Sequence, residues 1–209
     1  MISLIVDCQY FGNINYYKFL FQHKYIVIEQ YDYHQKTSFK NRCLIPGANG
    51  VVGLSVPLEK GRDQKTITKD LKIAYRDNWV LQHIRTLAST YNRAPFFEYY
   101  KDELFGLLET RPTFLLDLNI AATAWIAEKL GGGLDISLTE SYQPFLAEGF
   151  LDGRKIHTPR LELPPNTTHP YTQVFEDRIG YQSNMSILDL LFCTGKAGFG
   201  LLTDSKNLF

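Results

Sequence analysis

The sequence predicts an α/β fold: a central, mostly parallel or mixed sheet, drawn from the N-terminal third of the chain, with helices packed on it. Two observations predict this class. Residues 2–30 read as strand, loop, helix and strand, the order of a βαβ unit and a start that is compatible with a Rossmann-like fold. Residues 77–133 then carry three segments with helical periodicity. The length of 209 residues fits one domain of this kind.

The first strand is "ISLIV", a continuous apolar run that is typical of a strand buried on both faces. The loop "DCQYFGN" leads into the short helical pattern "INYYKFLFQ", and "KYIVIEQ" predicts the next strand. This order predicts a right-handed crossover. In such units, ligands tend to bind at the loop that follows the first strand.

A hairpin is predicted next, because "SFKNRCLI" and "VVGLSVPL" flank the turn signal Asn49-Gly50. With strand alternation, Lys40 and Arg42 would share one face and Asn41 would lie on the other. Residues 59–70 read as an exposed basic loop, and "LKIAY" reads as a short strand. We therefore expect the sheet to come from about the first 75 residues.

Helices are predicted over residues 77–92, 94–109 and 112–130. Asp77 is the expected N-cap of the first helix, and Gly131 ends the third. A last short helix is predicted within "NMSILDLLFCTG", with Asn184 or Ser186 as its cap, and the glycine-rich "GKAGFG" that follows reads as a flexible tail. No linker divides the pattern, so we expect one domain over residues 1–209. A long loop-rich excursion is expected at about residues 134–180, which are rich in Pro and Gly.

Composition excludes several classes of function. Lys plus Arg equals Asp plus Glu at 22 each, whereas a general nucleic-acid binder would show a basic excess. No apolar stretch approaches the length of a membrane span, and the N-terminus has no signal-peptide pattern. Three cysteines without a CxxC pair and five scattered histidines favour neither a disulfide framework nor a metal site. We expect a cytoplasmic protein without a metal or cofactor, which binds neither nucleic acid nor membrane.

The charge is nevertheless uneven. Residues 34–76 contain nine basic and three acidic side chains, so this segment has a net charge of +6. Such a segment suits a small ligand that carries phosphate or carboxylate. The predicted site brings together residues of four segments around one anion-accepting cleft: Lys36, Asn41, Arg42, Lys60, Gln9, Tyr10, Trp79 and His83. The alternative is a surface ion-pair network that contributes little free energy.

Two residues are candidates for proton transfer. Asp7 stands at the exit of the first strand, where it is either a general base or a loop cap. His83 lies one helical turn after Trp79, on the less apolar row of its helix, and is either a general acid–base or a hydrogen-bonded packing histidine. Cys8 is adjacent to Asp7, but no basic neighbour is evident, which favours a buried structural thiol.

Four segments in order resemble the WbqC-like family of bacterial proteins: "SFKNR", "LSVPLEKG", "YRDNWVLQHIRTLASTYNRAPFFEYY" and "NMSILDLLFCTG". The resemblance covers about residues 9–195. Many relatives leave the first strand through His-Gln-Pro, whereas this chain has "VDCQYFG", so no role of that histidine can be carried over. The chain resembles a shorter branch, without an additional segment after the third long helix.

The resemblance implies bacterial surface-polysaccharide (O-antigen) biosynthesis, with a transferase that moves a glycyl or acyl group onto an amino sugar. A phosphate-bearing donor would suit the basic segment. The alternative is a non-catalytic binding module that kept the pocket and lost the histidine. The first strand and helix also resemble, faintly, the start of nucleotidyltransferases, with "NINY" in the place of their His-x-x-His-type motif.

Overall fold

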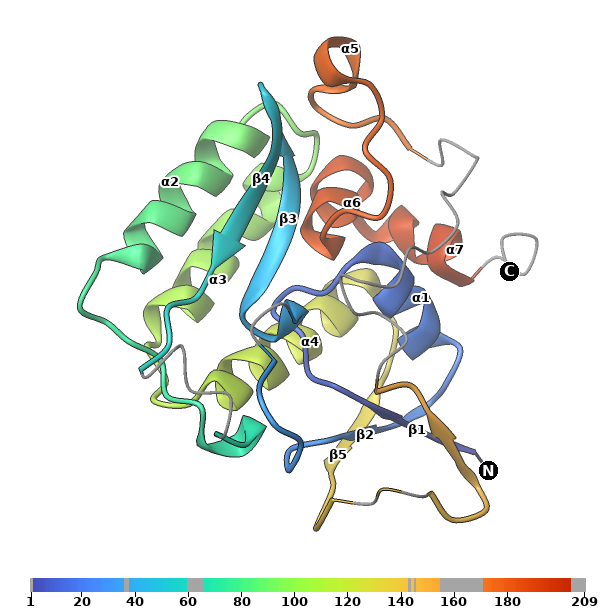
Figure 1. Ribbon diagram of the computed structural model, residues 1–209. Coiled ribbons are helices and arrows are strands. Elements are labelled where there is room, and N and C mark those ends of the chain that lie inside the picture. Colours follow the sequence, from blue (N-terminus) through green and yellow to red (C-terminus); the bar gives the residue numbers. More distant parts are fainter. Residues whose placement is uncertain are drawn as a thin grey trace.

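The computed structural model describes residues 2–35, 38–59, 66–142, 144, 146–154 and 171–203. Its central feature is a four-stranded parallel sheet in the order β5-β2-β1-β6 (Figure 1). The strands are β1 (Ser3–Val6), β2 (Tyr25–Ile28), β5 (Asp135–Leu138) and β6 (Phe150–Asp152). The α/β class that the sequence predicts is confirmed.

The strand–helix–strand unit at the N-terminus forms as predicted. Helix α1 (Ile14–Phe21) connects β1 to its parallel neighbour β2, with Leu4 opposite Ile26. Asn13 caps the helix, because its side chain accepts a hydrogen bond from the backbone N–H of Tyr16 at 2.9 Å. The unit therefore places the loop of residues 7–13 at the carboxyl end of β1.

The expected origin of the sheet was wrong in part. Strands β3 (Arg42–Gly47) and β4 (Gly50–Ser55) pair only with each other, as a separate antiparallel hairpin. The other half of the sheet comes from the segment expected to be loop-rich, which supplies β5 and β6. The "LKIAY" stretch forms isolated bridges at Lys72 and Ile73 and no strand. Strands β5 and β6 are only four and three residues long, which is too short for a periodicity signal in the sequence.

The entry to the hairpin also differs from the prediction. Residues Phe39–Asn41 form a 3₁₀ turn, η1, before β3 begins at Arg42. A 3₁₀ turn does not alternate its side chains between two faces, so Lys40 and Arg42 do not share a strand face. Lys40 is buried as a result, with 3% of its surface exposed. A second 3₁₀ turn, η2 (Thr68–Asp70), lies close to it in space, since Thr68 contacts Lys40.

The three long helices form close to their predicted bounds: α2 (Trp79–Tyr91), α3 (Phe97–Glu109) and α4 (Leu115–Leu130). The N-cap position of α2 is Asn78 rather than Asp77, and its side chain makes no capping hydrogen bond. Gly131 ends α4 in the left-handed conformation, φ 86°, as a glycine can without strain. Apolar residues of β1, β2, α1 and all three long helices belong to one buried cluster.

The C-terminal part packs beside α1 and the β3–β4 hairpin (Figure 1). It contains α5 (Glu176–Ile179), α6 (Ile187–Thr194), η3 (Gly195–Ala197) and α7 (Gly198–Thr203). Ser186 caps α6, as one of the two predicted caps. The stretch expected as a flexible tail is therefore helical, at least through Thr203. Within the described ranges, no helix is long and apolar enough to cross a membrane.

Candidate functional site

Polar residues follow three of the four strands of the sheet at their carboxyl ends. Asp7 follows β1, Glu29 follows β2 and Thr139 follows β5, whereas Gly153 follows β6. Because the four strands are parallel, these residues meet at one edge of the sheet. That edge is where open α/β sheets bind their ligands.

Asp7 is one of two buried carboxyls at this edge, with 4% of its surface exposed. The side-chain amide of Gln9 donates a hydrogen bond to Asp7 Oδ1 at 3.4 Å. Burial raises the pKa of Asp7 to about 6, although the Lys40 ammonium lowers it and the Asp32 carboxylate raises it further. Near neutral pH, Asp7 is thus able both to give up and to accept a proton.

Lys40 forms a buried ion pair with Asp32 and also donates a hydrogen bond to the Thr68 hydroxyl at 2.8 Å. That hydroxyl in turn donates to Asp32 Oδ1 at 2.5 Å. The Asp32 side chain is 23% exposed, so this group reaches solvent while Lys40 does not. Asp7 lies near this ion pair, so two carboxyl groups, those of Asp7 and Asp32, share the single ammonium of Lys40.

Asn119 of α4 fixes the two loops that carry these residues. Its amide donates to the Lys40 carbonyl at 2.7 Å and to the Cys8 carbonyl at 3.4 Å. The backbone N–H of Tyr10 adds a hydrogen bond to the Phe39 carbonyl at 3.1 Å. The exit of β1 and the η1 turn are therefore held side by side.

His34 lies near the Lys40–Asp32 ion pair, and both charges of that pair shift its pKa. Burial lowers the pKa of His34, Lys40 lowers it further and Asp32 opposes this shift. Its Nδ1 is buried and has no hydrogen-bond partner in the described part of the chain. A buried polar atom of this kind commonly meets a water or a ligand.

A second group joins three of the predicted residues. The Tyr10 hydroxyl and His83 Nδ1 are hydrogen-bonded at 3.0 Å, and the rings of His83 and Trp79 meet edge to face at 5.0 Å. Burial lowers the pKa of His83 to about 4, although a hydrogen bond to the backbone of Ser55 raises it. His83 is consequently neutral at pH 7, and its geometry is that of a histidine that holds Tyr10 in place.

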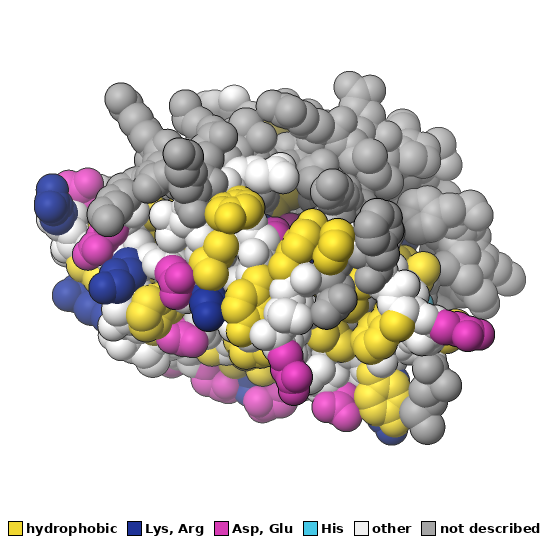
Figure 2. Space-filling model, turned by 60° about the horizontal axis from the view of Figure 1, so that its bottom comes forward, with side chains coloured by type: hydrophobic (Ala, Val, Ile, Leu, Met, Phe, Trp, Pro, Cys, Tyr) yellow, Lys and Arg dark blue, Asp and Glu magenta, His cyan; other side chains and the backbone are white. Residues whose placement is uncertain are grey.

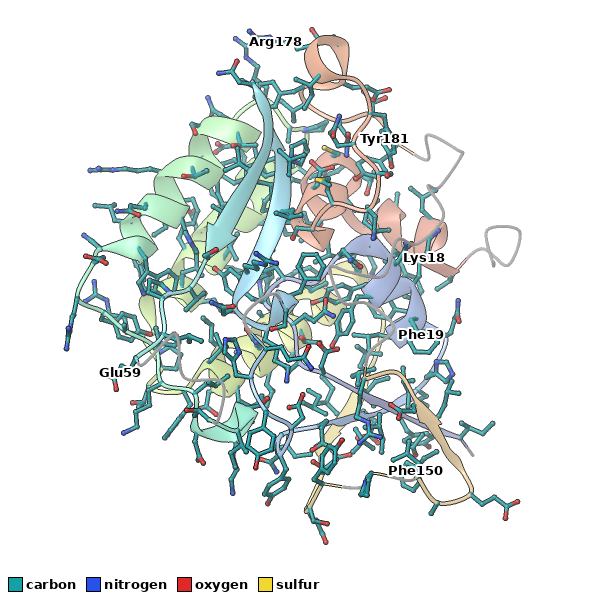
Figure 3. The ribbon with its side chains drawn as sticks, viewed as in Figure 1. Lys18, Phe19, Glu59, Phe150, Arg178 and Tyr181 are labelled. Atoms are coloured by element: carbon teal, nitrogen blue, oxygen red, sulfur yellow. The ribbon has the colours of Figure 1, made fainter. Side chains whose placement is uncertain are left out.

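The remaining predicted residues are Asn41, Arg42, Lys36 and Lys60. The contacts of the first two lie away from Asp7, and the other two lie outside the described ranges. The Asn41 amide donates to the Val56 carbonyl at 2.9 Å, inside the hairpin. The Arg42 guanidinium lies 6.0 Å from the centre of the Phe39 ring. Lys36 and Lys60 are outside the described residues, so their convergence on a cleft stays a prediction. The structure brings together Asp7 with Gln9, and Tyr10 with His83 and Trp79 (Figure 3 shows the side chains on their elements).

Sequence reasoning missed the polar residues that follow β2. Glu29 is fully buried and accepts hydrogen bonds from the Tyr31 N–H at 2.8 Å and the Thr139 hydroxyl at 3.0 Å. Arg154 forms an ion pair with Glu29 at 3.4 Å, which ties the ends of β2 and β6 together. The carboxyl-edge argument that selected Asp7 would have selected Glu29 and Asp32 if applied to the second strand. Among the described residues, no cluster of His, Cys, Asp and Glu could hold a metal ion.

The sequence segments that carry the family resemblance contact one another. Val56 of "LSVPLEKG" donates its N–H to the Asn41 carbonyl of "SFKNR" at 2.7 Å. The Tyr91 hydroxyl of the long helical segment donates to Asp189 of "NMSILDLLFCTG" at 3.0 Å. Ser186 of that last segment donates to the Phe11 carbonyl at 2.8 Å, next to the site.

Asp189 is the most heavily bonded of these residues. It is fully buried, and besides Tyr91 it accepts hydrogen bonds from the Tyr171 hydroxyl at 2.6 Å and the Gln173 amide at 2.7 Å. Burial raises the pKa of Asp189, and the three hydrogen bonds oppose that shift. Its role is to fasten residues 171–173 to α2 and α6.

Comparison with known proteins identifies the family. The model of the WbqC-like protein family matches residues 8–148, which include three of the four segments and the predicted site residues other than Asp7. Asp7 lies directly before the match, and the closing segment lies beyond it. No curated protein and no solved structure matches the chain. The matched residues make up more than half of the sequence, and the chain therefore belongs to the WbqC-like protein family.

Proposed function

We propose that the protein is a transferase of bacterial surface-polysaccharide biosynthesis, which moves a glycyl or other acyl group from a phosphate-bearing donor onto the amine of an amino sugar. The observation that carries this proposal is Asp7, a buried carboxyl with a pKa of about 6 at the carboxyl end of a central strand. A general base with a pKa near the working pH is the most effective, and this place in the fold is where substrates bind.

The chemistry assigns Asp7 one task. The acceptor arrives as an ammonium ion, which must lose a proton before its nitrogen can attack. Asp7 takes that proton, the nitrogen forms a bond to the acyl carbon, and the bond from that carbon to the phosphate-bearing group breaks. Its electron pair leaves on the phosphate oxygen, and the second proton of the bonded nitrogen passes to this leaving group. The carboxylates of Asp7 and Asp32 also suit the positive charge of the incoming amine.

The donor would be recognised by other residues. Arg42, with the predicted contributors Lys36 and Lys60, supplies cations for its phosphates, while Gln9 orients the Asp7 carboxyl. His83 and Trp79 hold the Tyr10 ring beside the loop that carries Asp7. In this assignment His83 is a positioning residue, because its pKa of about 4 leaves it a weak base.

The test is a transfer assay with nucleotide-linked amino sugars as acceptors and glycine plus ATP, or preformed glycyl-adenylate, as the donor. Mass spectrometry would detect the glycyl residue added to the sugar. We expect Asp7→Asn to lose about 10²–10⁴-fold in kcat, the usual contribution of a general base. Asp117→Asn removes an exposed carboxyl from α4 and is the matched control, with activity unchanged. Equal activity of Asp7→Asn and the parent would refute the assignment.

One observation favours a binding module as the second candidate. Both candidates for proton transfer are almost fully buried, Asp7 with 4% and His83 with 5% of their surfaces exposed. A module of this kind would bind a nucleotide-linked sugar without turnover. Calorimetric titration with the same sugars, combined with the transfer assay, distinguishes the two functions: saturable binding with no product supports the module.

A further inference from the structure

A shallow apolar groove of about 570 Å³ runs between α4 and β5 and reaches Leu138 at the carboxyl end of that strand. Small and aliphatic side chains line it, among them Ile120, Ala124 and Ala127 of the helix and Leu134, Ile136 and Leu138 of the strand segment. Leu138 is 40% exposed, so the groove is open to solvent at that end. Its small side chains leave room for a layer of side chains from another segment.

Within the described residues, the strand beside the groove has an edge without a partner strand. β5 is the last strand of the sheet order, and among the described strands it pairs only with β2. The N–H groups of Asp135 and Thr139 donate inward, to the carbonyls of Lys24 and Ile28. Backbone direction alternates along a strand, so the N–H and C=O groups of Ile136 and Leu138 point outward. Such an edge is a template for one more strand.

Of the described residues that line the groove, only Glu128 is charged, and further acidic residues are exposed on α4 and around β5; together these residues are called the acidic rim. Glu128 lines the groove with a side chain that is 72% exposed, and Asp117, Asp135 and Glu140 are exposed on α4 and around β5. Among the basic residues near the groove, Lys129 is already paired, because its ammonium binds Glu103 at 2.6 Å and Glu128 at 3.0 Å. Lys196 stands near Gly131, at the other end of α4 from Asp117. On the face that carries the sheet, hydrophobic side chains are exposed between acidic ones (Figure 2).

We propose that the β5 edge and the adjoining groove bind an extended partner segment in which apolar side chains alternate with Lys or Arg. The open backbone edge supplies strand pairing, the groove accepts the apolar side chains on one face, and the acidic rim attracts the basic ones. A second copy of this chain fits less well, because β5 paired with β5 would bring Asp135, Glu128 and Glu140 of both copies together. The inference is independent of the proposed transferase activity.

The probe is a fluorescein-labelled, eight-residue peptide of alternating Lys and Val, titrated with the full chain and followed by fluorescence anisotropy. We expect saturable binding with a dissociation constant on the order of 10–100 μM, because strand pairing and a few apolar contacts are the interactions available. A peptide of alternating Glu and Val should bind at least tenfold more weakly. A Lys–Val peptide with N-methylated backbone amides should lose binding, because methylation removes the strand hydrogen bonds.

Variants locate the binding site. Ala124→Trp fills the groove from an exposed position and should weaken binding of the Lys–Val peptide at least tenfold. Ser89→Trp, at an exposed position of α2, is the control that should leave binding unchanged. Melting curves check that both variants fold; if Ala124→Trp does not, Leu138→Glu blocks the same groove from a partly exposed position.

Two results would overturn the proposal. One is the absence of saturable peptide binding, or binding that the groove variants leave unchanged. The other is a dimer, seen by sedimentation, that Ala124→Trp abolishes, since the occupant of the groove would then be a second copy of the chain.

Discussion

Asp7 and His83 show how burial sets the chemistry of single residues in opposite directions. Burial removes water from both, which disfavours the charged form of each. The pKa of Asp7 therefore rises to about 6 and that of His83 falls to about 4. Between these values both side chains are mainly neutral, whereas at pH 7 Asp7 carries a buried charge that Lys40 and the hydrogen bond from Gln9 offset in part.

We predict that Asp7→Asn stabilises the folded protein at neutral pH. The pKa of Asp7 is higher in the folded than in the unfolded chain, so its contribution to stability is most favourable below pH 3.8 and is lost as pH rises through 6. The gain in unfolding free energy from Asp7→Asn should thus grow between pH 4 and pH 6, level off above that, and reach roughly 1–3 kcal/mol. Urea unfolding of the variant and parent across this range measures it.

The control for this prediction is Asp117→Asn, which removes an exposed carboxyl of α4 instead of a buried one. His83 changes the pH dependence of stability in the opposite direction, in a pH range that overlaps with that of Asp7. Because its pKa is lowered on folding, it contributes stability above pH 6.5 that is lost as pH falls towards 4. A constant difference between Asp7→Asn and the parent from pH 4 to 7 would contradict a raised pKa for Asp7.

At the scale of elements, the end of α4 determines where β5 begins. Gly131 takes φ 86°, and the N–H groups of Gly131 and Gly132 both donate to the Ala127 carbonyl. This cap turns the chain so that β5 can start at Asp135, beside β2. The cap therefore couples the longest helix to the edge of the sheet.

We predict that Gly131→Ala lowers the free energy of unfolding by about 1–2 kcal/mol, because alanine is strained at positive φ. The added methyl would meet Lys196 Cε at 2.6 Å, but this flexible side chain can move, so backbone strain dominates. Gly200→Ala is the matched control: a methyl there meets nothing within 4 Å, and the change should be neutral or slightly stabilising. Equal urea midpoints for the two variants would argue against a strained cap.

For the whole molecule, the fold depends on residues beyond the range that the family model matches. β6 and α6 both follow Glu148, and Ile187, Leu188 and Phe192 are fully buried in the common core. A fragment that ends at residue 148 would expose this apolar surface and leave one edge of β1 without a partner.

We therefore predict that residues 1–148 alone do not unfold cooperatively in urea. Addition of a fragment of residues 149–209 should restore a cooperative transition, because it supplies the missing strand and helix. Proton–nitrogen NMR spectra of the short fragment provide a second readout. Dispersed signals from the short fragment by itself would show that the matched range folds independently.

The elements that were predicted correctly from the sequence are those with a long periodic pattern or a clear turn signal. The three long helices, the N-terminal strand–helix–strand unit and the hairpin turn at Asn49-Gly50 all form near their expected positions. Half of the sheet, β1 and β2, was predicted correctly, and the other half was missed because β5 and β6 are so short that tertiary packing, rather than local pattern, makes them strands.

The candidate site was predicted in part for the same reason. Asp7, Gln9 and Tyr10 follow a clear strand, so the carboxyl-edge rule located them. Lys40 was read as an exposed strand residue, because nothing local indicates a 3₁₀ turn that points it at Asp32, eight residues earlier. Contacts such as Tyr10 with His83 join residues 73 positions apart, and no pattern within a single segment contains that information.

The position of β1 in the sheet has a consequence for how the chain is made. One neighbour of β1, the strand β2, is synthesised within the next 22 residues, but the other, β6, starts 144 residues after Val6. At about 5–20 residues per second, translation leaves one side of this apolar strand unpaired for about 7–30 s. The sheet can close only once residue 152 has left the ribosome, so the nascent chain passes through a long interval in which its first strand is a target for chaperones and for pairing with neighbouring chains.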